Sequence, residues 1–237
     1  LSTALALAGR VAGLGPGLRL AGAMTHFATA DDDAEFLEAQ RRAFEPFVEA
    51  LRGEQPDILV HAANSAGTLR GAGYHFDMVR CGIAIYGCDP ANRDPDEWDL
   101  EPALGLTSYV AAVKPAAPGH SVGYGRRFVA ASPTWIATIP IGYADGIRRA
   151  LSNNCEVLIR GRRYPLVGAV SMDNITVEVG ELAEVEVADT VTIIGRDGES
   201  RQTAEEVARR IDTINYEIVC GISARVPRHY HRDGRPA

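Results

Sequence analysis

Apolar and polar positions change their spacing along the first part of the chain. Residues 1–11 are rich in alanine and leucine, two strong helix formers, and predict a helix. Residues 18–24 and 58–61 are short apolar runs that predict strands. Between them, residues 34–51 repeat apolar positions near the helical period, after the capping residues Asp31 to Asp33. Strands that alternate with helices are typical of a parallel α/β sheet or barrel, whose functional site lies at the carboxyl ends of the strands.

Residues 76–87 are dominated by apolar residues and contain Arg80 and Gly82. No proline interrupts them, and we expect a strand that is covered on both faces. Arg80 cannot lose its proton, so in such a strand it needs an acceptor, and Gly82 lets a ligand or another backbone come close. An arginine followed by bare amide groups suits an anionic or heteroaromatic ligand. A structural salt bridge beside a turn is the alternative that this run alone leaves open.

The hydrophobic pattern becomes that of a β protein after residue 89. Residues 89–102 contain three prolines and six acidic residues and predict a linker or long loop. One helix is expected after Thr203, because Glu206 lies three residues later in a capping-box pattern. Short β-branched runs separated by glycine, proline or aspartate predict strands at residues 107–113, 135–139, 156–159, 164–170, 174–179 and 190–195. We therefore expect two domains, residues 1–98 and residues 99–237.

Composition narrows the class of protein. A net charge of −7 argues against nucleic acid or an anionic membrane as partner. No run approaches the roughly 18 to 20 apolar residues of a membrane span. The four cysteines lack metal-site spacing and are expected to be reduced thiols of a cytoplasmic protein.

Candidate chemistry gathers in four short segments of the second part, residues 121–126, 140–146, 170–174 and 213–217. Three of them place a tyrosine, Tyr124, Tyr143 or Tyr216, beside glycine or asparagine at an expected strand end, turn or helix end. A tyrosine hydroxyl can donate or accept a hydrogen bond, and a nearby cation makes its proton more acidic. Each tyrosine alone is explained as a half-buried aromatic residue, but three together favour a functional site.

Seven segments of the chain occur in the same order in alanine racemases, and the resemblance runs from about residue 18 to residue 228. These segments are residues 25–32, 61–65, 76–87, 122–126, 139–146, 168–173 and 214–220. The resemblance implies a pyridoxal-5′-phosphate enzyme that interconverts L- and D-alanine and supplies D-alanine for cell-wall precursors. It also implies an N-terminal (β/α)8 barrel, a C-terminal β domain and a head-to-tail homodimer with shared active sites.

The resemblance assigns catalytic roles to three residues. Tyr124 is similar to the tyrosine that exchanges the Cα proton on one face, in the active site of the partner subunit. A free phenol is a weak acid, so it needs help as a base, and a hydrogen bond from His26, which also lies by the cofactor ring, would provide it. Arg80 is similar to the partner of the pyridine nitrogen, where a permanent cation keeps that nitrogen unprotonated.

The remaining roles implied by the resemblance are binding roles. The phosphate group would be held by Ser65, the amide groups of Gly82 and Ile83, and the hydroxyl of Tyr216. Met172 and Asp173 would contact the substrate carboxylate. Tyr143 would narrow the channel that leads to the site. No metal ion is implied.

The chain departs from the family in one large respect. Its only lysine is Lys114, which precedes Pro115, whereas the family's Schiff-base lysine lies on the first barrel strand in a motif that does not occur here. We predict that Lys114 does not bind the cofactor. We also expect an incomplete barrel that contains only its C-terminal strands, because the first 90 residues supply three strands rather than eight. The other half is expected to precede Leu1, and the chain alone is expected to be inactive and poorly soluble.

Two other readings of the sequence remain. A lysine-free relative could bind a divalent metal through His26, Asp31 and His61 and act as a hydrolase, although Arg80 would repel the metal. A non-catalytic β module could bind a partner through its sheet, but this does not explain why three tyrosine loops occur together with the segment around Arg80.

Overall fold

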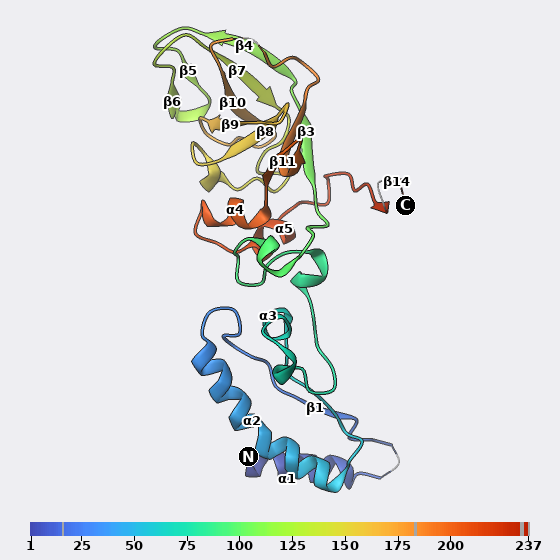
Figure 1. Ribbon diagram of the computed structural model, residues 1–237. Coiled ribbons are helices and arrows are strands. Elements are labelled where there is room, and N and C mark those ends of the chain that lie inside the picture. The colour runs from blue at the N-terminus through green and yellow to red at the C-terminus, as the bar shows by residue number, and fades with distance from the viewer. Residues whose placement is uncertain (16, 183, 233–234, 237) are drawn as a thin grey trace. The chain divides into compact units, whose positions relative to one another are not determined.

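The computed structural model describes residues 1–15, 17–182, 184–232 and 235–236 and divides the chain into two compact units. The first unit is Leu1–Glu101 and the second is Pro102–Ala237 (Figure 1). Each unit has its own hydrophobic core. No helix in the described part of the chain has the length and apolar character needed to cross a membrane.

The first unit is built from short parallel strands and helices. Its elements are α1 (Ser2–Ala12), β1 (Gly22–Met24), α2 (Ala34–Glu54), β2 (Leu59–His61), α3 (Ser65–Leu69), η1 (Ala72–Tyr74), η2 (Ile83–Tyr86) and η3 (Pro95–Trp98). β1 and β2 pair in parallel, with Gly22 opposite Leu59. A Cβ atom at Gly22 would lie 2.7 Å from the carbonyl oxygen of Leu59, so this register requires glycine. The predicted alternation of strand and helix is confirmed over these elements.

α2 begins where the sequence predicts. The side chain of Asp33 accepts a hydrogen bond from the amide of Phe36 at 2.9 Å and caps the helix. The apolar face of α2 packs into the core of the unit through Leu37, Phe44, Val48 and Leu51. That core also contains Phe27 and Val60, so α2 covers the segments that lead to the strand ends.

The prediction of a buried strand over residues 76–87 is wrong. Only Met78 pairs with β2, in a single parallel bridge to His61, and Phe76 has a left-handed φ of 53°. The chain then turns into η2, and Ile85 is 70% exposed. A short apolar run does not distinguish a strand from a helical turn by its spacing, which explains the error.

The second unit is a β domain, as predicted, and all strand pairs of its main sheet are antiparallel. The sheet has eight strands in the order β12-β11-β8-β9-β10-β7-β4, with β3 also paired to β11. These strands are β3 (Leu106–Tyr109), β4 (Ala112–Ala116), β7 (Thr134–Ile139), β8 (Glu156–Ile159), β9 (Arg162–Val167), β10 (Ile175–Gly180), β11 (Thr190–Asp197) and β12 (Ser200–Gln202). The single strand predicted over residues 107–113 is therefore wrong, because β3 pairs with β11 whereas β4 pairs with β7.

Shorter elements complete the second unit. They are β5 (Ser121–Val122), η4 (Tyr124–Arg126), β6 (Phe128–Val129), η5 (Arg149–Leu151), α4 (Ala204–Arg209), α5 (Asn215–Cys220), β13 (His231–Arg232) and β14 (Arg235–Pro236). Thr203 and Glu206 form the predicted capping box of α4. α4 and α5 lie together, and Val207 and Ile218 join them to the core that the sheet buries (Figure 1).

Candidate functional site

In the first unit, polar side chains from three segments meet beyond the ends of β1 and β2. Arg80 lies at the centre of this cluster. Its guanidinium donates to the carbonyl oxygens of Thr25 at 3.0 Å and of Ala62 at 3.2 Å, and its NH2 lies 3.2 Å from Nδ1 of His26. The acceptors of this partly buried arginine are thus backbone carbonyls and imidazoles that follow the two strands.

His61 is the closest side chain to Arg80. Nδ1 of His61 lies 2.6 Å from NH1 of Arg80, and since a guanidinium can only donate, Nδ1 accepts and the ring proton is on Nε2. Burial, together with the charge of Arg80, lowers the pKa of His61 from its ordinary value of 6.5. The imidazole is therefore neutral at pH 7. The sequence analysis named His61 only as a metal ligand of an alternative reading, and its position directly at the end of a strand was the signal for this contact.

Ser65 joins the start of α3 to the segment that follows Arg80. Its Oγ is buried and accepts from the amide of Gly82 at 2.8 Å and from the amide of Ala84 at 3.3 Å. A Cβ atom at Gly82 would lie 4.0 Å from this oxygen, so a side chain at this position would stand directly beside the hydroxyl. The amide of Ile83 begins η2 and has no acceptor within that helix. One hydroxyl and several amide groups are therefore gathered at one place.

Asn64 orients this cluster, and the sequence analysis gave it no role. Its Oδ1 accepts from the amide of Gly67 at 2.9 Å and caps α3, while its Nδ2 donates to the carbonyl oxygen of Phe27 at 3.2 Å. The same Nδ2 is 3.4 Å from Nε2 of His26. Asn64 therefore ties the residue after β2 to the loop after β1.

In the second unit, Tyr124 lies at the tip of the β5–β6 hairpin. Its neighbours Gly123 and Gly125 have φ values of 73° and 70°, a conformation that glycine adopts without strain, and its side chain is 78% exposed. A cavity of about 360 Å³ lies beside it, lined by Gly123, Tyr124, Ala169, Ser171, Asn174 and Thr176. The phenol therefore faces away from the core of its own unit.

Tyr143 and Met172 lie in two loops that are paired through their backbones. The amide of Tyr143 donates to the carbonyl oxygen of Ser171 at 2.9 Å, and the amide of Ala144 donates to that of Met172 at 3.0 Å. A Cβ atom at Gly142 would lie 2.4 Å from the carbonyl oxygens of both Ser171 and Met172. The close approach of these loops thus depends on glycine at position 142, and both tyrosine and methionine side chains remain substantially exposed.

Arg225 connects the same two loops, and the sequence analysis missed it. Its Nε donates to Oδ1 of Asp145 at 2.6 Å, and its NH2 donates to Oδ2 of Asp145 at 3.1 Å and to Oδ1 of Asp173 at 2.5 Å. The bonds from Arg225, and the amide of Gly142 at 2.8 Å, hold the pKa of Asp145 below its usual range. Asp173 is thereby part of an ion-pair network.

Tyr216 is the second residue of α5, next to a buried polar pair. Nδ2 of Asn215 donates to Oε1 of Glu205 at 2.8 Å, and both side chains are fully buried. Tyr216 itself is 36% exposed. Tyr216 thus lies at the start of α5, where a helix end was predicted, and its neighbour Asn215 is held in the core by Glu205.

Two predictions about other ligands can be compared with these contacts. Within the described residues, no three His, Cys, Asp or Glu side chains are placed to hold a metal ion. His26 and His61, which the metal alternative requires, both face the permanent cation of Arg80. Lys114 is exposed on β4, the last strand in the order of the sheet, opposite Ile136.

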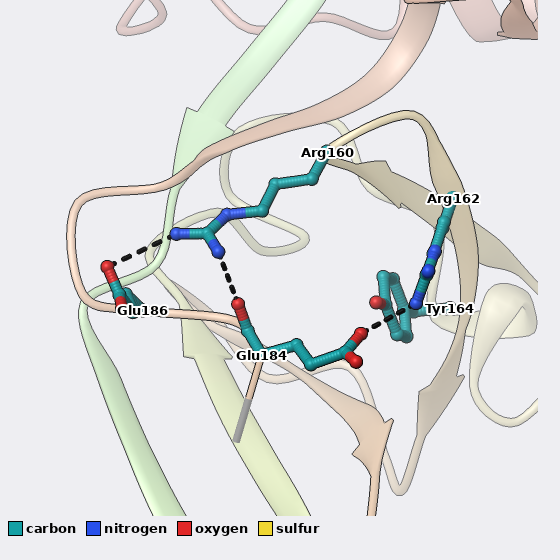
Figure 2. A pocket seen from close by; sticks show the side chains of 5 residues that line it. All are labelled: Arg160, Arg162, Tyr164, Glu184 and Glu186. Atoms are coloured by element: carbon teal, nitrogen blue, oxygen red, sulfur yellow. Dashed lines mark hydrogen bonds and ion pairs between the residues drawn. The ribbon is translucent and has the colours of Figure 1, made fainter. Parts of the chain in front are cut away.

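A charged hollow on the second unit has a structural explanation. It is lined by Arg160, Arg162, Tyr164, Glu184 and Glu186 (Figure 2). Arg162 pairs with Glu184 at 2.6 Å and Arg160 pairs with Glu186 at 3.2 Å. Both guanidinium groups therefore bind neighbouring carboxylates and join the β8–β9 turn to residues 184–186.

Comparison with known proteins points to one family for both units. The family model described as "Alanine racemase, N-terminal domain" matches residues 2–90, and that described as "Alanine racemase, C-terminal domain" matches residues 103–230. The chain is 47% identical over 212 residues to an alanine racemase of Symbiobacterium thermophilum, covering 88% of this chain and 56% of the relative. It is 41% identical over 215 residues to an alanine racemase of Halothermothrix orenii, and this match covers 90% of this chain and 57% of the relative.

Solved structures agree with the sequence matches. The chain resembles the alanine racemase of Bacillus anthracis with bound L-Ala-P, with a TM-score of 0.84, 42% identity and coverage of 93% of this chain and 57% of that one. It also resembles the alanine racemase of a D-cycloserine-producing Streptomyces lavendulae, with a TM-score of 0.88, 36% identity and coverage of 97% and 61%. The chain thus spans a little over half the length of the relatives that it matches.

Proposed function

The chain belongs to the alanine racemase family, and from this premise we propose that the protein containing it interconverts L- and D-alanine with pyridoxal 5′-phosphate as cofactor. The observation that carries the proposal is the convergence of His26, Ser65, Arg80 and the amides of Gly82 and Ile83 beyond the ends of β1 and β2. The metal-dependent and non-catalytic alternatives account for none of these contacts.

The donor set of the first unit fits the proposed cofactor. A phosphate group requires several hydrogen-bond donors. The Ser65 hydroxyl and the amide of Ile83 would supply them, and the amide of Gly82 would exchange Oγ of Ser65, which it bonds at 2.8 Å here, for a phosphate oxygen. Tyr216 would add a hydroxyl from the second unit. When bound, pyridoxal 5′-phosphate supplies the electron-withdrawing ring that makes the Cα proton of an amino acid removable.

Arg80 would hold the ring nitrogen of that cofactor. Neutral His61 and two backbone carbonyls fix the guanidinium without neutralising its charge. A permanent cation beside a pyridine nitrogen keeps that nitrogen unprotonated, which limits how strongly the ring withdraws electrons. Arg80 would thus favour simple proton exchange over side reactions. Nδ1 of His26 lies 3.2 Å from the guanidinium of Arg80.

Tyr124 would carry the proton on one face of the substrate. Its exposed position at a hairpin tip supports action outside its own unit, in the active site of a partner in a head-to-tail homodimer. The loops that hold Tyr143, Met172 and Asp173 would bind the carboxylate of alanine and narrow the access to the site. The first unit would be the C-terminal portion of a (β/α)8 barrel, with the domain boundary near residues 98 and 99, and the protein would be cytoplasmic.

The cofactor lysine is not expected to be Lys114. Lys114 is exposed on β4, the last strand in the order of the sheet, and its partner across the strand pair is the apolar Ile136. The remaining base and the covalent attachment point would come from residues outside this chain, so the 237 residues alone are predicted to be inactive.

The proposal is tested on the product of the complete coding sequence. Tyr124→Phe should lower the rate of alanine racemisation by about a hundredfold or more, because it removes a proton carrier, while the absorbance of bound cofactor stays unchanged. Tyr109→Phe is the matched control, since Tyr109 is another exposed tyrosine of the same unit. A wild-type protein that neither binds the cofactor nor racemises alanine would contradict the proposal, and a fully active Tyr124→Phe variant would contradict the role of Tyr124.

A further inference from the structure

The hairpin that carries Tyr124 is not part of the eight-stranded sheet. β5 and β6 pair only with each other among the described strands, and the hairpin is packed on the unit through Val122 and Phe128. These apolar contacts hold the base of the hairpin. The loop at its tip, residues 123–127, needs other contacts if Tyr124 is to keep one position.

The start of that loop rests on the turn between β9 and β10. A Cβ atom at Gly123 would lie 3.4 Å from the amide nitrogen of Ala169, and a Cβ atom at Gly168 would lie 3.0 Å from the carbonyl oxygen of Val122. Two glycines therefore bring the backbones of the two segments together. The same turn leads directly to Ser171, Met172 and Asp173.

The end of the loop is joined to the same turn by one side chain. Nδ2 of Asn153 donates to the carbonyl oxygen of Arg127 at 3.0 Å, and Oδ1 of Asn153 accepts from the amide of Gly168 at 2.5 Å. Asn153 has a φ of 56°, a conformation that asparagine tolerates better than most residues. The neighbouring Ser152 accepts from the amide of Val170 at 3.0 Å but makes no bond to the hairpin in the described residues.

We propose that Asn153 is a positioning residue that fixes Tyr124 by bonding its loop to the β9–β10 turn. This inference rests on the proposed function. It identifies Asn153 as the residue that holds the loop of Tyr124 in one position. Its amide is the only side chain group that bonds both segments among the hydrogen bonds of the described chain. Proton transfer depends on the placement of the base to within about 1 Å, and a misplacement of that size costs on the order of a hundredfold in rate.

Two substitutions separate the two bonds. Asn153→Gly keeps the left-handed backbone and removes both bonds. Asn153→Asp keeps an acceptor for Gly168 but turns an oxygen toward the carbonyl of Arg127, so it removes only the bond to the tyrosine loop. Asn154→Ala is the matched control, because Asn154 is exposed and bonds the carbonyl of Arg210 instead.

The measurements are kcat in both directions and the isotope effect of Cα-deuterated alanine, on the product of the complete coding sequence. Both Asn153 variants should lose about tenfold to a hundredfold in kcat. The isotope effect should rise in the direction in which Tyr124 removes the proton, since that transfer becomes slower. A merely structural loss lowers the number of active molecules and leaves both isotope effects unchanged.

The outcomes distinguish this proposal from the proposed function. Absence of racemisation by the wild-type protein refutes both. A racemising wild type whose Asn153→Asp variant keeps kcat within twofold refutes the positioning role alone, as does a loss of kcat with both isotope effects unchanged. If Asn153→Gly does not fold, Asn153→Asp decides the question.

Discussion

Arg225 joins two loops that carry proposed site residues, and the Arg225→Gln substitution measures what this junction contributes to the stability of the second unit. Arg225 makes two bonds to Asp145 and one to Asp173. Glutamine cannot replace the paired donors of the guanidinium. The carboxylate of Asp145, whose side chain is only 13% exposed, would keep the amide of Gly142 as a partner but lose the cation.

The expected loss lies between two limits. Breaking a buried ion pair costs about 3–5 kcal/mol, whereas exposed pairs contribute about 0.2–1 kcal/mol. Since Arg225 is 49% exposed, solvent screens much of the interaction, and we expect a loss of about 1–2 kcal/mol in the free energy of unfolding. Arg162→Gln is the control, because Arg162 and Glu184 are both mostly exposed and their pair should contribute less than about 1 kcal/mol.

The assay is urea unfolding followed by tryptophan fluorescence. The chain has two tryptophans, one in each unit, so Trp98→Phe leaves Trp135 of β7 as the reporter of the second unit. Because the pKa of Asp145 is lowered in the folded state, its pairing stabilises the protein above the ordinary carboxyl value of 3.8 and is lost as the pH falls through the lowered pKa. The difference between wild type and Arg225→Gln should therefore be largest near pH 7 and shrink below about pH 4. A loss at pH 7 no larger than that of Arg162→Gln, or a difference that grows as the pH falls, would refute this reasoning.

Two further predictions concern the loops and the first unit. Gly142→Ala should destabilise the second unit by about 3 kcal/mol, because its Cβ would lie 2.4 Å from the carbonyl oxygen of Met172. Gly105→Ala is the control: its Cβ would lie 3.8 Å from the carbonyl oxygen of Ile194, so the unfolding free energy should change by less than about 1 kcal/mol. Because the pKa of His61 is lower in the folded than in the unfolded chain, the unfolded chain takes up a proton at a higher pH. The stability of the first unit should therefore fall as the pH drops through 6.5, and Trp98 fluorescence follows its unfolding. His61→Gln should remove that part of the pH dependence, and an unchanged pH profile would contradict it.

Local sequence patterns predicted the features that depend on contacts between residues close in the sequence. The caps at Asp33 and Thr203 follow from side chains that bond amides within the next three residues, and both are observed. The run at residues 76–87 failed because its apolar residues have no period that separates a strand from a 3-10 turn. Whether such a run pairs with a neighbour depends on the neighbour, which the run itself does not encode.

The candidate site shows the same difference between contacts that local sequence predicts and contacts that tertiary folding sets. His26 and Ser65 could be grouped in advance, because parallel strands bring their carboxyl ends to one edge. Arg80 reaches them although the strand predicted around it does not form. Asn153 and Arg225 could not, since their partners are set by tertiary folding: Arg225 bonds a residue 80 positions away, and Asn153 bonds backbone groups that belong to two other loops. Polar residues that bond groups far away in the sequence leave no periodic signal in it.

Residues with proposed roles occur in both units, and this has a consequence for how substitutions act. His26, Ser65 and Arg80, proposed to hold the cofactor, lie in a unit with its own core, whereas the second unit carries Tyr124, Met172 and Asp173 and adds only the hydroxyl of Tyr216 to the proposed cofactor contacts. A loosened contact in the second unit, such as that of Asn153, should therefore change proton transfer and leave cofactor binding by Ser65 and Arg80 intact. Loss of cofactor absorbance in step with kcat would show that the two units depend on one another for stability, while loss of kcat alone would show that the second unit contributes the proton carrier and little of the cofactor affinity.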